Sequence, residues 1–307
     1  MEVTARAARR GDTPALAAAS VDTSSKIAVD RRQLLGGLAA VPLAASIPAG
    51  RAAAARPAAA PIIDVVLAPG LTVLVQDAGE TGVAAFESAD GRRTVASDFE
   101  RIRTAYLPAS TFKIPHTLIA LETGVVASLD EPLFKWDGTV RTLDGKPIDA
   151  WNRDQTLREA FRNSTIWVYQ EVARKVGPER MTRLVTALDY GNRAVGEIDS
   201  FWLSGPLRIS ALEQIAFLGR LRAGALPVSA RAQALTREAM VIETENTHVL
   251  SGKTGWAFDQ KIGWFVGWIE ANGASRLFAL NLDVAGQKSL AARTALVKSA
   301  AHQLRVL

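Results

Sequence analysis

The chain has 307 residues, of which 48% are hydrophobic and 22% are charged, and its formal net charge is +5. Residues 1–55 hold seven of the 36 basic and four of the 31 acidic residues, so residues 56–307 carry a net charge of only +2 and show no basic excess of the kind that binds nucleic acid. There is no cysteine, which excludes disulfides, thiol catalysis and cysteine-ligated zinc.

The first predicted segment is a leader for export. A paired arginine, Arg31-Arg32, precedes a short Ala/Gly-rich apolar run that ends near residue 49, and small residues at Ala-x-Ala spacing follow up to residue 55. This combination resembles a twin-arginine export signal. The apolar run is short and is interrupted by Pro42, so it does not predict a membrane span. We expect residues 1–55 to be removed on export to the bacterial periplasm; the alternative is a disordered Ala-rich leader.

After the leader we expect one domain. Residues 56–69 are rich in Ala and Pro near their start and predict a tether, and residues 70–307 suffice for a single domain with a sizeable core. No second long apolar segment occurs, so we expect no membrane contact by the mature protein. Residues 71–76 and 82–88 are β-branched, small or aromatic and flank a turn, which predicts an antiparallel hairpin.

The central stretch, roughly residues 109–245, is predicted to be mostly helical. Gly177-Pro178 is expected to end one helix and begin the next, and Gly224 lies where a helix C-terminus is expected. Two capping boxes precede amphipathic runs and predict where two helices begin. These boxes are Thr156-x-x-Glu159 and Ser210-x-x-Glu213.

The chain returns to predicted strands over about residues 247–254, 262–270 and 276–284, and a last amphipathic helix covers about 290–304. A strand hairpin, then helices, then three strands and a helix indicate an α/β protein of the α+β type. We expect an antiparallel sheet flanked by helices, with an all-α lobe inserted into it.

Ser110 and Lys113 are the first candidates for chemistry. They form the single Ser-x-x-Lys of the sequence. A Ser and a Lys three positions apart on a helical turn share a face, so a neutral amine can serve as the base for a hydroxyl nucleophile. Taken alone, the pattern also fits a helix cap beside a solvated lysine. Pro115 follows closely and predicts a local distortion of this helix.

Three further stretches make the pattern specific. Ser164 lies at a predicted junction between helices, and a Lys-Thr-Gly, which arises by chance about once in several thousand positions, lies in a predicted strand. The stretches, in chain order, are Asn163-Ser164-Thr165-Ile166, Tyr190-Gly191-Asn192 followed by Phe201-Trp202-Leu203-Ser204-Gly205, and Lys253-Thr254-Gly255-Trp256.

Together these motifs resemble the serine penicillin-recognising enzymes and, among them, the class D β-lactamases, over about residues 70–305. The resemblance implies a two-lobed β-lactamase/transpeptidase-like fold and hydrolysis of the β-lactam amide through a covalent acyl-enzyme. Class A enzymes share Ser-x-x-Lys and Lys-Thr-Gly but have Ser-Asp-Asn between them. Here the middle motif ends in the apolar Ile166, which separates this chain from class A.

The resemblance also implies roles for individual residues. Ser110 would attack the lactam carbonyl, and Lys113 would be the general base, carrying an N6-carboxyl group formed from carbon dioxide or bicarbonate. No other cofactor and no metal is expected. Ser164, helped by Lys253, would relay a proton to the leaving nitrogen. The expected substrate-binding residues are Thr254, Gly255, Trp256 and Arg293, and the backbone N–H groups of Ser110 and Trp256 would form the oxyanion hole.

An apolar pocket around Lys113 is part of this expectation. Carbon dioxide adds only to a neutral amine, so burial must lower the pKa of the lysine. The indole N–H of Trp202 would donate a hydrogen bond to the carboxylated lysine. The alternative for Trp202 is an ordinary core residue. The pocket residues are expected to be Phe112, Ile166, Trp202 and Leu203, with Ile166 at a position where the resembling enzymes usually have Val.

Other conspicuous residues have simpler interpretations. Tyr190-Gly191-Asn192 is typical of a turn. Trp151, Trp264 and Trp268 are interpreted as packing residues. His116, His248 and His302 are too scattered to indicate a zinc site.

Two alternatives to a hydrolase stay open at this point. One keeps the acylation but not the turnover, as in a penicillin sensor or a cell-wall peptidase. The other is a catalytically silent ligand-binding or structural homologue. The expected partner is a small β-lactam, without nucleic acid, and the protein is expected to be a monomer or a homodimer.

Overall fold

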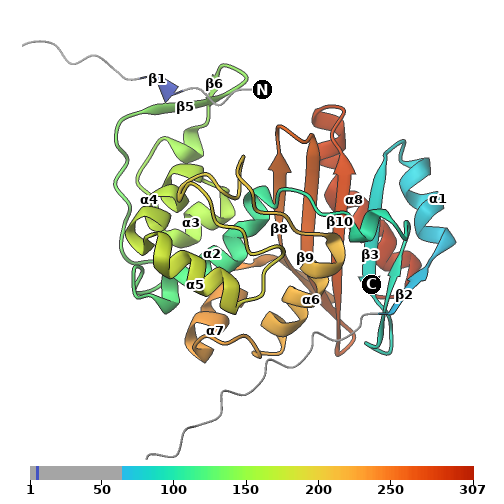
Figure 1. Ribbon diagram of the computed structural model, residues 1–307. Coiled ribbons are helices and arrows are strands. Elements are labelled where there is room, and N and C mark those ends of the chain that lie inside the picture. The colour runs from blue at the N-terminus through green and yellow to red at the C-terminus, as the bar shows by residue number, and fades with distance from the viewer. Residues whose placement is uncertain (1–4, 7–63) are drawn as a thin grey trace, which may run out of the picture. The chain divides into compact units, whose positions relative to one another are not determined.

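The computed structural model describes residues 5–6 and 64–307. Its main feature is a seven-stranded sheet in the order β2-β4-β3-β10-β9-β8-β7 (Figure 1). Neighbouring strands are antiparallel, except that β2 and β4 are parallel. The strands are β2 (Asp64–Leu67), β3 (Gly82–Glu87), β4 (Arg93–Ala96), β7 (Val241–Thr244), β8 (His248–Ala257), β9 (Ile262–Ala271) and β10 (Ala274–Asp283).

The predicted helical lobe is present between β4 and β7 (Figure 1). It contains α2 (Lys113–Glu122), α3 (Leu157–Arg162), α4 (Ile166–Val176), α5 (Pro178–Ala187), α6 (Ala211–Arg222) and α7 (Ala230–Ala239), with short 3₁₀ turns η1 (Arg101–Arg103), η2 (Ala109–Phe112) and η3 (Asp149–Trp151). Strands β5 (Val140–Leu143) and β6 (Lys146–Pro147) form a small hairpin there, and β1 (Ala5–Arg6) pairs with β5. The α+β architecture with an inserted helical lobe is therefore confirmed.

The hairpin predicted over residues 71–76 and 82–88 is wrong in its first half. The segment Pro69–Asp77 is helix α1 instead, with Pro69 at a first-turn position where its missing N–H is no loss. Leu71 and Val75, four residues apart, share one face of α1 and are buried. The β-branched residues of this segment favoured a strand, but packing of the apolar face outweighs that propensity.

The tether predicted over residues 56–69 needs a correction at its C-terminal end. Residues 64–67 form strand β2, and α1 begins at Pro69, so the folded domain includes residues that were assigned to the tether. The rest of the predicted tether, and the predicted leader apart from residues 5–6, lie outside the described residues.

The helix boundaries read from the sequence are confirmed. The hydroxyl of Thr156 accepts a hydrogen bond from the Glu159 N–H, and the Glu159 carboxylate accepts one from the Thr156 N–H; Ser210 and Glu213 do the same at the start of α6. Gly177, with φ of +80°, ends α4 and precedes Pro178 at the start of α5. Each capping box satisfies two backbone donors that a helix N-terminus leaves free.

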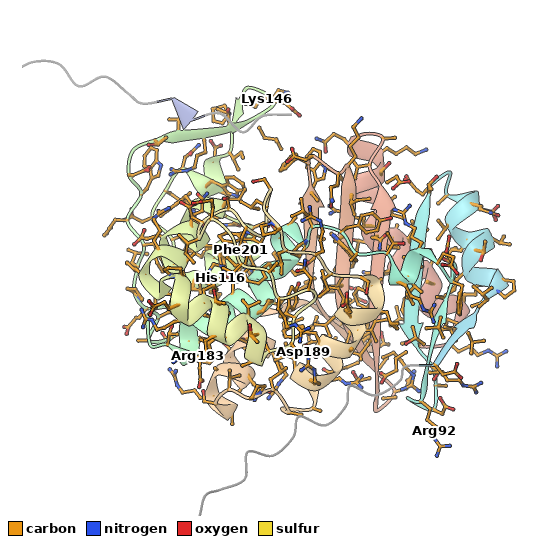
Figure 2. The ribbon with its side chains drawn as sticks, in the orientation of Figure 1. Arg92, His116, Lys146, Arg183, Asp189 and Phe201 are labelled. Carbon is orange, nitrogen blue, oxygen red and sulfur yellow. The ribbon has the colours of Figure 1, made fainter. Side chains whose placement is uncertain are left out.

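The sheet separates two apolar cores. Successive side chains of a strand point to opposite faces, and β9 shows this clearly: Trp264, Val266 and Trp268 belong to the core shared with the helical lobe. Phe265 and Ile269 belong to the core under α1 and α8 (Gln287–Gln303). His116 and Phe201 lie inside the helical lobe (Figure 2). The packing roles predicted for Trp264 and Trp268 are therefore confirmed.

Among the described residues, no helix combines the length and the apolar character that crossing a bilayer requires.

Candidate active site

Ser110 and Lys113 lie at the point where the 3₁₀ turn η2 passes into α2. In a 3₁₀ turn, side chains three residues apart eclipse each other, which brings this pair together. The Lys113 Nζ donates to the Ser110 Oγ over 3.1 Å. The distortion predicted from Pro115 takes this form: α2 begins only at Lys113, so the missing N–H of Pro115 falls in the first turn, where it has no partner in the helix.

The backbone before Ser110 is fixed from several sides. Ala109 has a φ of +47°, a left-handed conformation that places the serine at a sharp turn, and its N–H donates to the Trp202 carbonyl over 3.0 Å. The indole N–H of Trp264 donates to the Leu107 carbonyl over 2.9 Å. A non-glycine residue with positive φ carries strain that the surrounding contacts must hold, as is common at functional sites.

Lys113 is completely buried. Burial, and then the positive charge of Lys253, hold the pKa of this amine well below its ordinary value, which favours the neutral amine over the ammonium form. Its Nζ lies 5.0 Å from the centre of the Tyr169 ring. A neutral amine in an apolar site can accept a proton or react with an electrophile.

Two of the residues predicted to surround Lys113 are stacked aromatic rings. Phe112 and Trp202 are fully buried and stack with ring centres 5.7 Å apart. The Trp202 Nε1 has no hydrogen-bond partner among the described residues, although it is buried. Leu203 is half-buried and packs against the same core, while Ile166 lies at the start of α4 and lines the cavity above Ser110.

Ser164 and Lys253 form a second serine–lysine pair. Ser164 lies in the turn between α3 and α4 with a φ of +59°, as predicted for a helix junction. The Lys253 Nζ donates to the Ser164 Oγ over 3.0 Å and to the Thr254 carbonyl over 3.1 Å. Burial, and then the charge of Arg293, lower the pKa of Lys253 to about 7. This amine can therefore carry or release a proton near neutral pH.

Strand β8 brings the Lys-Thr-Gly motif against the serine turn. A Cβ on Gly255 would lie 2.9 Å from the Pro108 carbonyl oxygen and 3.1 Å from the Thr111 nitrogen, so only glycine allows this approach. The next residue, Trp256, packs on Phe258 with ring centres 4.1 Å apart. The close approach places the backbone of β8 beside Ser110.

Arg293 reaches the same strand from α8. Its Nη1 donates to the Gly255 carbonyl over 2.7 Å and to the Trp264 carbonyl over 3.1 Å, and its Nε donates to the Leu290 carbonyl. Burial lowers its pKa to about 10, so the guanidinium is still positive at neutral pH. Arg293, which the sequence suggested as a substrate-binding residue, lies on the wall of the same cavity as Ser110.

Several of these residues, although not Lys253, line a cavity of about 160 Å³. The predicted residues on its wall are Ser110, Ser164, Ile166, Thr254, Gly255, Trp256 and Arg293. Lys113, Phe112 and Trp202 are completely buried and do not line it. The structure thus places the predicted nucleophile and substrate-binding residues around one space, with the lysine pocket buried next to it.

Four wall residues were missed or misread. Trp151, interpreted as packing, lines the cavity and donates its indole N–H to the Asn163 carbonyl, next to Ser164. Leu143, Ile148 and Phe258 also line it. These three apolar residues lie in a hairpin and in short connections and belong to no motif. The one signal in the sequence is that Ile148 is close to Trp151 and Phe258 is close to Trp256.

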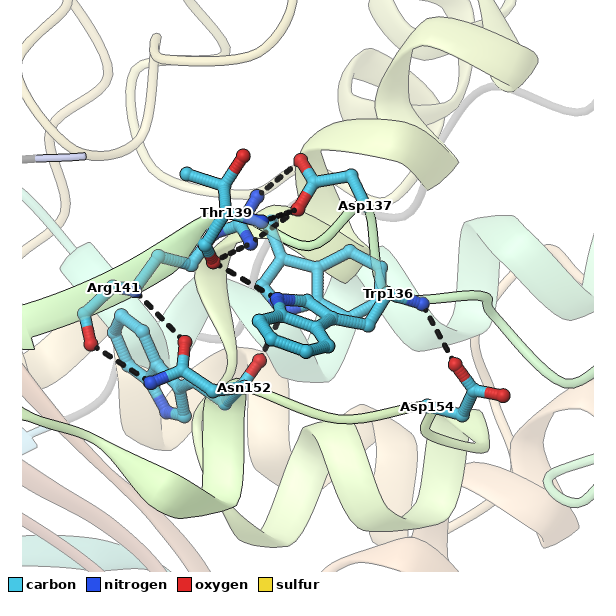
Figure 3. A network of polar contacts seen from close by, with 8 residues as sticks. Trp136, Asp137, Thr139, Arg141, Asn152 and Asp154 are labelled. Carbon is cyan, nitrogen blue, oxygen red and sulfur yellow. Dashed lines mark hydrogen bonds and ion pairs between the residues drawn. The ribbon is translucent and has the colours of Figure 1, made fainter. Parts of the chain in front are cut away.

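A polar network holds the hairpin side of this wall (Figure 3). The Arg141 N–H donates to the Asn152 Oδ1 over 2.8 Å, and the Asn152 Nδ2 donates back to the Arg141 carbonyl over 3.1 Å. The Arg141 guanidinium forms a two-point contact with Asp137. The network ties β5 to the segment that follows Trp151, which positions both Leu143 and Trp151 at the cavity.

Tyr190 and the histidines lie outside the cavity. Tyr190 is fully buried, accepts a hydrogen bond from the Gln214 amide and packs on Phe112, while Gly191 forms the predicted turn with a φ of +54°. Pairing of β7 with β8 brings His248 near Glu243 and Glu245, which the spacing of histidines alone did not indicate. Glu243 is there engaged by Lys298 through both carboxylate oxygens.

Comparisons with known proteins show which family this chain resembles. The family model of the penicillin binding protein transpeptidase domain matches residues 71–302. β-Lactamase OXA-48 of Klebsiella pneumoniae is 41% identical over 229 residues, which cover 74% of this chain and 84% of that protein.

Two solved structures are similar over nearly their whole length. The class D β-lactamase YbXI from Nostoc matches with a TM-score of 0.73 and 39% identity, covering 77% of this chain and 99% of the other. The class D β-lactamase FUS-1 (OXA-85) from Fusobacterium nucleatum subsp. polymorphum matches with a TM-score of 0.74 and 34% identity, covering 79% and 100%.

Proposed function

Given that this chain belongs to the class D β-lactamases and hydrolyses β-lactams through a serine, we propose that Ser110 is that serine and Lys113 its base. The observation that carries the assignment is the contact of 3.1 Å between the Ser110 Oγ and the completely buried amine of Lys113. The base is the carboxylated form of Lys113 proposed below, which takes the hydroxyl proton while the oxygen attacks the lactam carbonyl. The product of this step is an ester on Ser110 with the ring C–N bond broken.

We propose that Lys113 is carboxylated when the enzyme is active. The pocket fits such a group, because the buried Trp202 Nε1 has no partner among the described residues and needs an acceptor nearby. A carboxyl group on the Lys113 Nζ would supply the general base that activates water for hydrolysis of the ester. Phe112 and Trp202 keep the amine away from water, and so keep it neutral and able to react with carbon dioxide.

The second pair has a complementary role in this proposal. When the C–N bond breaks, the ring nitrogen needs a proton. Ser164 lines the cavity and Lys253 donates to its hydroxyl, so a proton can pass from the lysine through the serine to the nitrogen. With a pKa of about 7, Lys253 can give this proton and regain it at neutral pH.

Substrate binding is assigned to the cationic end of the cavity. β-Lactams of this kind carry a carboxylate, and Arg293 and Thr254 lie on the cavity wall. The Arg293 guanidinium is held by two backbone carbonyls and keeps its positive charge at neutral pH. The backbone N–H groups of Ser110 and Trp256 are assigned to the oxyanion hole, which is worth a few kcal/mol.

We also propose that the protein is exported to the periplasm by the twin-arginine route. The support is Arg31-Arg32 ahead of a short apolar run and small residues, within residues 1–55 that would be removed. The catalytic domain then begins close to Asp64, the first residue of β2.

The assignment of Lys113 is tested with Lys113→Ala. Wild type should turn over a chromogenic cephalosporin, and added bicarbonate should restore activity lost through decarboxylation. The variant should lose about 100- to 10,000-fold in kcat, as expected for loss of a general base, and mass spectrometry should show the acyl adduct on Ser110. Lys298→Ala, which removes a lysine paired with Glu243 outside the cavity, should keep turnover. Persistent turnover in Lys113→Ala without an adduct would show that the base is a different group.

A further inference from the structure

His116 is a buried histidine with no assigned role. It lies on α2 one helical turn after Lys113, is completely buried, and is labelled within the helical lobe in Figure 2. Neither of its ring nitrogens has a hydrogen-bond partner among residues 64–307. A buried polar group without a partner costs free energy, so it calls for a physical reason.

The surroundings of His116 are aromatic rings, and one of them, Tyr169, also lies beside Lys113. The ring centre of His116 lies 5.1 Å from that of Trp202, 5.1 Å from that of Tyr169 and 5.4 Å from that of Phe112. The Lys113 Nζ lies 5.0 Å from the same Tyr169 ring. Residues three apart on a helix share a face, so the imidazole and the amine border one buried space.

The groups around this space have more hydrogen-bond donors than acceptors. The Trp202 Nε1–H has no acceptor in the part of the chain that the structure describes, and a neutral imidazole adds one N–H donor of its own. Burial, and then the charge of Lys113, lower the pKa of His116 to about 3, so the ring is neutral at working pH. A neutral amine has one lone pair, so the Lys113 Nζ can accept a hydrogen bond from at most one of these two donors. A single group with two acceptor atoms, such as a carboxyl group on Lys113, would satisfy both donors.

We propose that His116 is a positioning residue for carboxylated Lys113, donating its ring N–H to one carboxyl oxygen while the Trp202 Nε1–H is donated to the carboxyl group as well. The inference rests on the proposed carboxylation. In that reaction the lone pair of the Lys113 Nζ forms a bond to the carbon of carbon dioxide, one C=O electron pair moves to oxygen, and a proton leaves the nitrogen for solvent. His116 is not consumed; its hydrogen bond stabilises the product and fixes its orientation.

The carboxylation equilibrium provides the first test. With ¹³C-bicarbonate, the carbamate carbon of the whole protein is followed by NMR as bicarbonate is titrated. His116→Phe keeps a ring but has no donor, and should need about tenfold more bicarbonate for half-carboxylation, which corresponds to about 1.4 kcal/mol. His116→Asn restores an N–H donor and should recover most of the affinity. Tyr169→Phe loses the hydrogen bond to Thr117 in the same cluster, but no donor to the carbamate, and should stay near wild type.

Several outcomes would overturn the inference. A wild-type bicarbonate dependence in His116→Phe means that the ring N–H does not stabilise the carbamate. Equal weakening in His116→Phe and His116→Asn means that the ring acts through packing. Absence of any carbamate signal in wild type overturns both this inference and the carboxylation of Lys113, while the adduct on Ser110 still tests the serine assignment separately.

A second measurement needs no variant. The chain has three histidines, so their ring ¹⁵N signals can be told apart in the wild-type protein. Addition of bicarbonate should shift the signals of His116 and leave those of His248 and His302 unchanged, since both lie on other elements. If the carbamate forms and the His116 signals do not move, the proposed hydrogen bond is absent.

Discussion

At the scale of single residues, the site depends on two lysine amines whose pKa values are lowered. The Lys113 Nζ contacts the Ser110 Oγ at 3.1 Å, and the Lys253 Nζ contacts the Ser164 Oγ at 3.0 Å. Burial is the largest cause of both pKa shifts, and in Lys113 the charge of Lys253 adds to it. Each lysine is thus prepared to exchange a proton with the hydroxyl beside it, which an exposed lysine at neutral pH does not do.

This arrangement predicts how stability changes with pH. The pKa of Lys253 is about 7 in the folded protein and near 10.5 in the unfolded chain, so between these values the unfolded chain binds more protons. The unfolding free energy must then rise with pH from about 7 to about 10.5, by up to about 1.4 kcal/mol per pH unit for this lysine. Lys253→Met should remove that part of the slope. The unfolding free energy of the variant, relative to that of wild type, should therefore be more favourable at pH 7 than at pH 10.

Urea unfolding of both proteins between pH 7 and pH 10, in buffer free of carbon dioxide, measures this slope. The pKa of Lys113 depends in part on the charge of Lys253, so both proteins are measured with Lys113→Met added, which removes the contribution of Lys113 from the comparison. Equal slopes with and without Lys253→Met would mean that Lys253 keeps its ordinary pKa despite its burial.

At the scale of elements, the site is made by β8 lying against the turn η2. Gly255 allows this contact, since a Cβ there would meet the Pro108 carbonyl oxygen at 2.9 Å. The strand carries Lys253 on the same segment, and the turn carries Ser110. The distance between the two elements therefore sets the distance between the groups that react.

Gly255→Ala should separate these two elements. Because the clash is with backbone atoms, the strand or the turn must move, and a displacement of about 1 Å can lower kcat/KM about 100-fold. The unfolding free energy should fall by about 1–3 kcal/mol, as for other overpacked sites. Gly286→Ala is the matched control, because it adds the same methyl group where there is no atom within 4 Å. Wild-type kcat/KM in Gly255→Ala would mean that the close contact is not needed for catalysis.

The elements that sequence patterns predicted well are those with local signals. The capping boxes at Thr156 and Ser210 are recognisable within a few residues and begin α3 and α6 as predicted. The motif residues Ser110 and Lys253 are also recognisable locally, and they lie in the turn η2 and in strand β8. Helix α1 was misread because its β-branched residues favour a strand, and burial of Leu71 depends on partners far along the chain. The cavity wall from Leu143, Ile148 and Phe258 has no local signal for the same reason: it is formed by tertiary contacts.

At the scale of the whole folded domain, the sheet separates two apolar cores that differ in their relation to the catalytic groups. The core on one face contains Phe112, Trp202 and the helices of the inserted lobe, so it surrounds the catalytic groups. The core on the other face lies under α1 and α8 and supports the sheet from behind. Packing defects in the two cores should therefore lower stability alike but affect catalysis differently.

Leu118→Ala and Leu296→Ala test this division. Both side chains are buried, Leu118 on α2 in the first core and Leu296 on α8 in the second, and either truncation should lower the unfolding free energy by about 2–5 kcal/mol. Because α2 also carries Lys113, Leu118→Ala should lower kcat/KM by about 10- to 100-fold under conditions where the protein is fully folded. Leu296→Ala should leave kcat/KM within about twofold, since the sheet lies between it and the cavity. If both variants lost the same unfolding free energy and the same kcat/KM, a packing defect behind the sheet would affect the cavity as much as one beside it. The division between the two cores would then have no effect on catalysis.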